Sequence, residues 1–159
     1  MAAKTYSLDF DGYWPAGAVA GLPASSGVYC VYACTHDARS RTVSLKRRLL
    51  YIGEAVNIRD RVTAHERWDD WRRRLNFGEE LCFNAALISP QADRERAEAA
   101  MIFKHKPPCN TQCVDTFRFD TTTIWTSGKN ALLHPQFTVS PTPASLGLAG
   151  LGTFSQPRW

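Results

Sequence analysis

The sequence lacks long apolar segments. None of its 159 residues lies in an uninterrupted apolar run of about 18 residues, the length that a helix needs to cross a bilayer. The first residues, Met1 to Tyr6, also lack the apolar core of a signal peptide. We therefore expect a cytoplasmic protein with no membrane-spanning segment.

Cysteine is scarce, and its number is odd. The five residues are Cys30, Cys34, Cys82, Cys109 and Cys113. An odd number without an export signal predicts reduced thiols rather than a disulfide framework. The cysteine pairs 30/34 and 109/113 are compatible with a zinc site. However, structural zinc sites usually have closer ligand spacing or a His pair. Buried free thiols are the favoured interpretation.

Internal repeats are also absent, and the length is that of one domain. With 44% hydrophobic and 21% charged residues, a chain of this size can bury a core without disulfides or metals. We expect four parts: a lead-in that packs on the domain, the domain itself, an extension with short strands, and a flexible tail. Their expected bounds are 1–26, 27–112, 113–139 and 140–159.

Positive charge is concentrated in one segment. Between Arg39 and Arg74, eleven basic residues accompany five acidic ones, a net charge of +6 (11 minus 5), whereas the whole chain carries +4. Concentrated positive charge is typical of proteins that bind nucleic acids. The alternative is a solvated surface that only keeps the protein soluble.

Residues 27–53 predict an antiparallel hairpin. Gly27 to Cys34 is rich in β-branched and aromatic residues. After a polar, basic loop at 35–47, Arg48 to Tyr51 resumes the pattern as a second strand, which stops at Gly53. Period-two alternation places odd-numbered residues such as Tyr29 on one face and even-numbered residues on the other.

Helical periodicity follows the hairpin. Apolar residues from Val56 to Leu75 recur at helical spacing, and Asn57 is a suitable N-cap. Residues 81–88 predict a third strand and 92–104 a second helix, which Pro107-Pro108 cannot continue. Further short strands are expected at 117–119 and 121–125, and residues 1–26 are expected to be irregular because they are rich in Gly, Pro and Ala.

Five blocks of residues now stand in the order strand, strand, helix, helix, loop. They are Gly27-Val28-Tyr29, Tyr51-Ile52-Gly53, Asn57-Ile58-Arg59-Asp60-Arg61 with His65, Ala97-Glu98-Ala99-Ala100-Met101-Ile102, and Lys106-Pro107-Pro108-Cys109-Asn110. In this order and at these separations, the chain resembles the GIY-YIG nuclease family over about residues 22–112. The separation of 22 residues between Tyr29 and Tyr51 is closest to the restriction-endonuclease branch of that family.

The resemblance implies an α/β (α+β) fold with a small antiparallel three-stranded sheet flanked by helices. It also implies hydrolysis of DNA phosphodiester bonds with one divalent metal, Mg²⁺ or Mn²⁺. By position, Glu98 is the metal ligand, Arg61 binds the scissile phosphate, and Tyr29 and Tyr51 orient or deprotonate the attacking water. His65 is placed near that water, and Asn110 braces the site.

Elementary chemistry is compatible with these roles. A hard cation such as Mg²⁺ often takes only one or two protein carboxylates, so Glu98 alone can suffice. The planar fork of Arg61 fits two phosphate oxygens. Arg61 and His65 are four residues apart, so a continuous helix presents both on the same face.

Glu54 departs from the family pattern, because many members carry a Lys at this position. A carboxylate there repels phosphate unless it pairs with Arg59 or Arg61 or joins the metal site, and the proton-handling role then shifts towards His65. The extra length of the hairpin predicts that it contacts the DNA backbone. The candidate DNA-binding residues are Arg39, Arg41, Lys46, Arg47, Arg48 and Arg59.

Two alternatives to an active endonuclease stay open. One is a catalytically impaired nucleic-acid-binding module on the same fold, disrupted by Glu54. The other is an interaction protein that uses exposed tryptophans, namely Trp14, Trp68, Trp71, Trp125 and Trp159. Cleavage specificity and the choice between monomer and homodimer are not encoded in any recognisable pattern.

Overall fold

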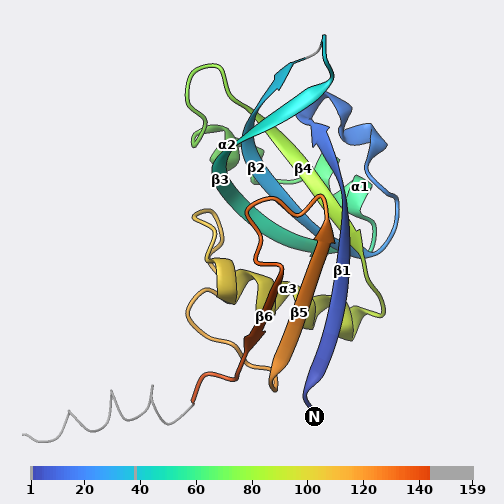
Figure 1. Ribbon diagram of the computed structural model, residues 1–159, viewed down its shortest axis with the longest axis vertical. Helices are drawn as coiled ribbons and strands as arrows, with labels where there is room; N and C mark the ends of the chain where they lie inside the picture. Colours follow the sequence, from blue (N-terminus) through green and yellow to red (C-terminus); the bar gives the residue numbers. More distant parts are fainter. Residues whose placement is uncertain (1, 38, 144–159) are drawn as a thin grey trace, which may run out of the picture.

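The computed structural model describes residues 2–37 and 39–143 and has one six-stranded sheet (Figure 1). The strand order is β3-β2-β4-β1-β5-β6, in which β1 and β5 run parallel and the other neighbours antiparallel. The strands are β1 Lys4–Pro15, β2 Gly27–Asp37, β3 Thr42–Ala55, β4 Glu80–Leu87, β5 Thr122–Gly128 and β6 Gln136–Val139. The helices are the 3₁₀ helix η1 Ala16–Gly21, α1 Ile58–Thr63, α2 Trp68–Arg72 and α3 Gln91–His105.

The α+β class agrees with the sequence-based expectation, but the predicted three-stranded sheet is too small. The three expected strands are β2, β3 and β4, and they do form an antiparallel unit. Residues 4–15 were expected to be irregular and instead form β1, which pairs with β4 on one side and β5 on the other. Backbone pairing on both sides, together with burial of Leu8 and Phe10, outweighs the low strand propensity of this segment. The strand pairs also show that one sheet includes residues on both sides of 27–112; the four-part division itself stays a prediction.

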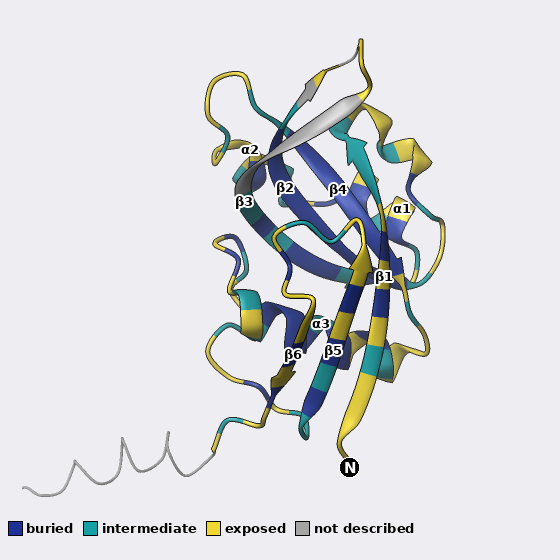
Figure 2. Cartoon of the chain, viewed as in Figure 1, coloured by how far each residue is buried: buried dark blue, intermediate teal, exposed yellow. Residues whose placement is uncertain are grey.

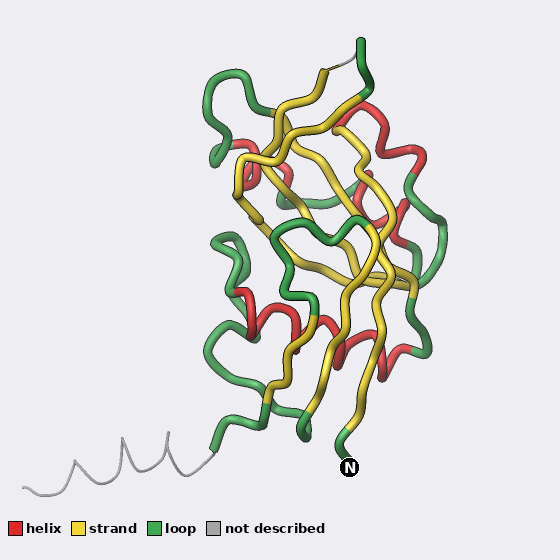
Figure 3. The backbone as a smooth tube through the Cα atoms, in the orientation of Figure 1, coloured by secondary structure: helices red, strands yellow, loops and turns green. Residues whose placement is uncertain are grey.

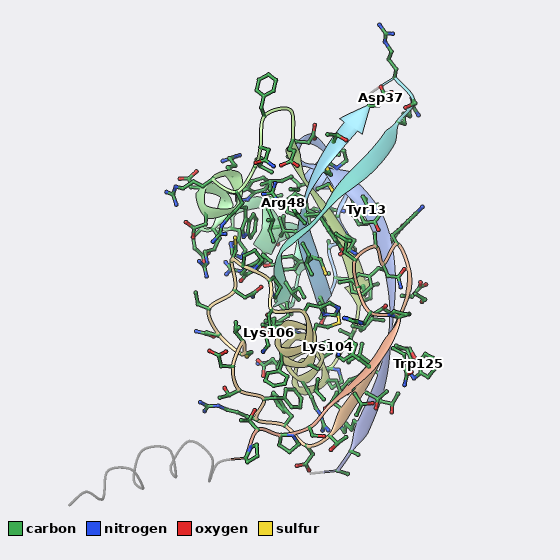
Figure 4. The ribbon with its side chains drawn as sticks, turned by 60° about the vertical axis from the view of Figure 1, so that its left-hand side comes forward. Tyr13, Asp37, Arg48, Lys104, Lys106 and Trp125 are labelled. Atoms are coloured by element: carbon green, nitrogen blue, oxygen red, sulfur yellow. The ribbon has the colours of Figure 1, made fainter. Side chains whose placement is uncertain are left out.

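The β2–β3 hairpin is longer than predicted. Its strands reach Asp37 and resume at Thr42, so most of the expected loop at 35–47 is paired. Lys46 and Arg47 therefore belong to β3, and their side chains lie outside the described residues, as does all but the first part of the expected tail. Figure 4 shows Asp37 near the hairpin tip, well away from Lys104 on α3 and from Lys106, which follows the end of that helix.

The sheet has a core on each face, as the alternation in β2 predicted. Cys30, Tyr32 and Cys34 pack on the face covered by α3 and by β5 and β6. Tyr29, Val31 and Ala33 pack on the other face, with α1 and α2. The central strands β2 and β4 are consequently dark blue in Figure 2.

The single helix expected over 56–75 is instead two short helices, visible as separate red segments in Figure 3. Asn57 caps α1 as predicted, since its side chain accepts a hydrogen bond from the Asp60 N–H at 3.1 Å. At the other end of α1, the Trp68 indole N–H donates to the Val62 carbonyl at 2.7 Å. This bond satisfies a carbonyl that a continuing helix would use and turns the chain back onto the sheet.

The tryptophans do not form one exposed surface. Trp71 is fully buried, Trp14 and Trp68 are half-buried, and Trp125 is 51% exposed, whereas Trp159 lies outside the described residues. Four of the five cysteines are buried as free thiols, and Cys113 is half-buried. None of the helices in the described part of the chain is long and apolar enough to cross a membrane.

Candidate active site

Tyr29 and Gly53 face each other across the β2–β3 pair. The Tyr29 ring lies directly over Gly53, and an added Cβ at Gly53 would overlap the Tyr29 hydroxyl and ring. Gly27 is similarly constrained, because a Cβ there would overlap the Ala86 carbonyl of β4. The two glycines of the sequence motif thus make room for close contacts, one of which places Tyr29.

Three rings gather beside this contact. The ring centroids of Tyr29 and Tyr51 are 6.3 Å apart, those of Tyr29 and His65 are 6.3 Å apart, and those of Tyr51 and His65 are 5.4 Å apart. Tyr29 is buried, whereas Tyr51 is half-buried. Burial, and next the neighbouring Tyr51, raises the pKa of Tyr29, and burial followed by the charge of Glu98 raises the pKa of Tyr51. Both phenols are therefore protonated at neutral pH.

His65 does not lie on the same helix face as Arg61, because α1 ends at Thr63. Its Nδ1 accepts a hydrogen bond from the Arg67 backbone N–H at 3.0 Å, which places the imidazole proton on Nε2. Burial, followed by the nearby charge of Arg61, lowers the pKa of His65 to about 4. At neutral pH this imidazole is a neutral hydrogen-bond donor, and its basic nitrogen is already occupied.

Arg61 forms a two-pronged ion pair with Glu66. Its Nη1 and Nη2 donate to the two carboxylate oxygens at 2.8 and 3.1 Å. Both side chains are substantially exposed, and the hydrogen bond from Arg61 lowers the pKa of Glu66 to about 2. A carboxylate thus occupies the donors that a phosphate would use.

Glu98 lies on α3 and lines a cavity of about 260 Å³ together with Tyr51, Arg61 and Asn110. Burial, and next the charge of Glu54, raises the pKa of Glu98 to about 8. In the described part of the chain, no three His, Cys, Asp or Glu side chains gather into a metal site. Glu98 is therefore a carboxyl group at the wall of a polar cavity that Glu66 also lines, and burial together with the charge of Glu54 favours its protonated form.

The cavity lies at the edge of the sheet formed by β3. Helix α3 packs on one face and α1 and α2 on the other, and side chains from both sides meet beyond this edge. Four of the six predicted catalytic residues line the cavity, and Tyr29 and His65 stand beside Tyr51. The structure brings the whole set together.

Asn110 closes the free edge of β3. Its side-chain oxygen accepts from the Ile52 N–H at 3.0 Å, and its side-chain nitrogen donates to the Ile52 carbonyl at 2.9 Å. The Cys109 N–H also donates to the Leu50 carbonyl at 2.9 Å. Asn110 thus replaces a neighbouring strand at the residue next to Tyr51 and fixes the backbone there.

Glu54 pairs with Arg94 of α3, not with Arg59 or Arg61. Arg94 is buried and also donates to the Ser26 hydroxyl at 3.0 Å. The carboxylate that departs from the family pattern is therefore neutralised by a cation one helical turn before Glu98.

The predicted DNA-binding residues are dispersed. Arg39 and Arg41 are exposed at the hairpin tip, far from α3. Arg48 pairs with Glu79 at 2.6 Å, and the Arg59 Nε donates to the Leu22 carbonyl at 2.8 Å. Their role in DNA binding stays a prediction.

Sequence reasoning did not assign Glu66, Arg67, Trp71 or Arg94 to the site. Arg67 lies over the Tyr51 ring at 5.8 Å from its centroid, and the Trp71 ring is 4.6 Å from that of His65. The signal for Glu66 was available, because it is adjacent to His65 and five residues after Arg61. The contact between Glu54 and Arg94 joins residues 40 positions apart and had no local signal.

The comparisons with known proteins both return the protein UvrC. The chain is 31% identical over 96 residues to the UvrABC system protein C of Haloarcula marismortui. That similarity covers 59% of this chain but only 15% of the relative. The resemblance to the GIY-YIG family is confirmed.

Other comparisons add less. A solved structure of the GIY-YIG N-terminal endonuclease domain of UvrC from Thermotoga maritima, a point mutant bound to its catalytic divalent cation, is 17% identical. The match covers 59% of this chain and 91% of that domain with a TM-score of 0.41, a likeness too low to support an argument about the fold. No family model matches the chain.

Proposed function

We propose that this chain is a divalent-metal-dependent DNA endonuclease with a GIY-YIG active site. The observation that carries the proposal is the shared cavity, in which Glu98, Arg61 and Tyr51 meet from three separate elements. The sequence similarity to UvrC supports the same reaction class.

The residues fit a divalent cation at Glu98. Its carboxylate faces a polar cavity, and its raised pKa reflects a negative charge that a cation would stabilise. Mg²⁺ and Mn²⁺ keep several waters and accept a single protein carboxylate. When bound, the cation would supply Lewis-acid stabilisation of the phosphate charge.

The chain's own residues perform the remaining steps. Arg61 exchanges the Glu66 carboxylate for two phosphate oxygens and stabilises the charge that develops there. Tyr51 presents its oxygen to the attacking water. Burial and the charge of Glu98 raise the pKa of Tyr51, and the charges of Arg67 and Arg61 oppose that shift. Once the phenol has lost its proton to solvent, its oxygen can take the proton of the attacking water. We assign this proton acceptor to Tyr51 rather than His65, since the basic nitrogen of His65 already accepts the Arg67 N–H. Tyr29 and His65 hold the Tyr51 ring in place, and Asn110 holds the backbone beside it.

Plasmid nicking in Mg²⁺ or Mn²⁺ tests the proposal. Glu98→Gln should abolish nicking while DNA binding persists, because it removes the carboxylate and keeps the shape. Glu95→Gln is the matched control, since Glu95 is exposed on the same helix. Nicking by Glu98→Gln at the wild-type rate would contradict the proposed metal ligand.

A catalytically quiet nucleic-acid-binding module is the second candidate. The observation that favours it is the occupation of Arg61 by Glu66. Wild-type protein that binds DNA but nicks no plasmid at any Mg²⁺ or Mn²⁺ concentration would support this alternative.

A further inference from the structure

Two more cavities adjoin the one at Glu98. A cavity of about 320 Å³ shares Arg67 and Thr111 with it. A larger cavity of about 540 Å³ shares Thr111, Gln112 and Cys113 with it. Thr111 lines all three, so the cavities are neighbours along the segment 111–113, and the one at Glu98 shares lining residues with both of the others. The three cavities together are called the groove below.

The first end of this groove is rich in guanidinium groups. Arg67, Arg73 and Arg74 line it, and Asp70 is the carboxylate among its lining residues. Asp70 accepts from Arg67 at 3.0 Å and from Arg73 at 2.7 Å. Among the described residues, no carboxylate pairs with Arg74, which faces the Cys109 thiol instead. With three guanidinium groups and one carboxylate, this end carries excess positive charge, and guanidinium forks bind phosphate.

The opposite end has a different chemistry. Ala99, Val114 and Phe119 give it apolar and aromatic walls. Its polar lining comprises Gln112, Thr116, Arg118 and one carboxylate, Asp115. Phe119 is braced by Phe117, at 5.6 Å between ring centroids. An aromatic wall next to polar side chains suits a nucleobase and its sugar, because bases of any sequence stack on such rings.

We propose that the groove binds one nucleic-acid strand across the catalytic cavity. Arg67, Arg73 and Arg74 hold backbone phosphate on one side of the scissile bond, and the cavity at Phe119 and Arg118 takes a nucleoside on the other. The position of the scissile phosphate rests on the proposed function, whereas the strand binding itself does not require cleavage. Four of the predicted DNA-binding residues have described side chains, and none of them lines these three cavities; they are Arg39, Arg41, Arg48 and Arg59.

The salt dependence of binding tests the arginine end. The probe is a fluorescein-labelled single-stranded DNA of about eight nucleotides. The protein carries Glu98→Gln so that it does not cleave this DNA. Arg74→Ala should flatten the slope of log K against log salt by about 0.7, the value for one phosphate contact on a single strand. Arg72→Ala is the matched control, because Arg72 is two residues away and stacks on Trp68 outside the groove. An unchanged slope for Arg74→Ala would overturn the proposal.

Chemical labelling of Cys113 tests strand binding at the other end of the groove. Cys113 lines both the cavity at Glu98 and the larger cavity, and the four remaining cysteines are buried. Saturating oligonucleotide should slow N-ethylmaleimide labelling of Cys113 several-fold, measured by peptide mass spectrometry, and Cys113→Ser identifies the labelled site. Equal labelling rates with and without oligonucleotide would overturn the placement of the strand at this end.

These measurements separate the groove from the proposed function. If wild-type protein nicks no plasmid while the slope and the labelling change as expected, the groove stands and the endonuclease proposal fails. If plasmid is nicked and neither measurement changes, the groove fails alone.

Discussion

Glu66 holds the guanidinium of Arg61 by both of its outer nitrogens, in the geometry that a phosphate would adopt. The pair is exposed to solvent, so its net contribution to stability is small, and a phosphate can displace the carboxylate. Glu66 therefore affects whether Arg61 is free to bind phosphate more than it affects the stability of the fold.

Glu66→Gln should tighten binding of the Glu98→Gln protein to a short oligonucleotide by about two- to five-fold, the range for an exposed ion pair. The amide still supports the fold but competes less strongly with phosphate. Fluorescence anisotropy at low salt measures the change. Asp69→Gln is the control, because Asp69 pairs with Arg72 away from the cavity. Weaker binding by Glu66→Gln would show that Glu66 positions Arg61 instead of competing for it.

The pH dependence of stability should reveal Glu98. Its pKa in the folded protein, about 8, lies above its ordinary value near 4.5. The unfolded chain therefore loses this proton first as pH rises, and the native state loses stability between about pH 4.5 and pH 8. Glu98→Gln should raise the melting temperature at pH 8 without metal, and the difference should vanish near pH 4. A constant difference across this range would rule out the raised pKa.

The affinity for a divalent metal should also depend on the protonation of Glu98. Below about pH 8, protons compete with the cation for Glu98, so Mn²⁺ affinity should rise with pH by up to about tenfold per unit and then level off. Isothermal titration calorimetry of the wild-type protein measures this. A flat profile between pH 6 and pH 8 would assign the metal to another ligand.

Gly53→Ala should destabilise the protein by about 1–3 kcal/mol, since the new methyl group overlaps the Tyr29 ring. The rate of plasmid nicking should also fall, because Tyr29 must move away from Tyr51 to make room for the methyl group. Urea denaturation gives the stability. Gly17→Ala is the matched control, because a Cβ at Gly17 meets no atom within 4 Å. Equal stabilities of the two variants would refute the contact.

The contributions of Glu54 and Arg94 to the free energy of unfolding should be coupled. Glu54→Gln should cost about 1–3 kcal/mol of stability, the cost of a buried donor that loses its partner, because it leaves the buried Arg94 without its carboxylate. It should also lower the pKa of Glu98, since Glu54 is one of the charges that raise it. The double variant Glu54→Leu with Arg94→Met should lose less stability than the two single variants added together. Simple additivity would show that the two residues are not coupled.

The sequence indicated the candidate catalytic residues but not their surroundings. Strand alternation predicted the face of Tyr29, and the Asn57 cap predicted the start of α1, because both depend on neighbouring residues. The break after Thr63 was missed, because it depends on the Trp68 indole reaching Val62 and on the burial of His65. The same break gave His65 its hydrogen-bonded Nδ1, which changes its chemistry from base to donor.

By itself, the sequence determined which side chains can perform the chemistry and, through local periodicity, the hairpin, the third strand and α3. Only the tertiary structure decided that β1 joins the sheet and that Glu54 pairs with Arg94. It also decided that Glu66 occupies Arg61. The physical reason is that period-two and helical patterns are set by near neighbours along the chain. Strand pairing and buried ion pairs instead depend on which residues, distant in the sequence, pack next to each other in the folded chain.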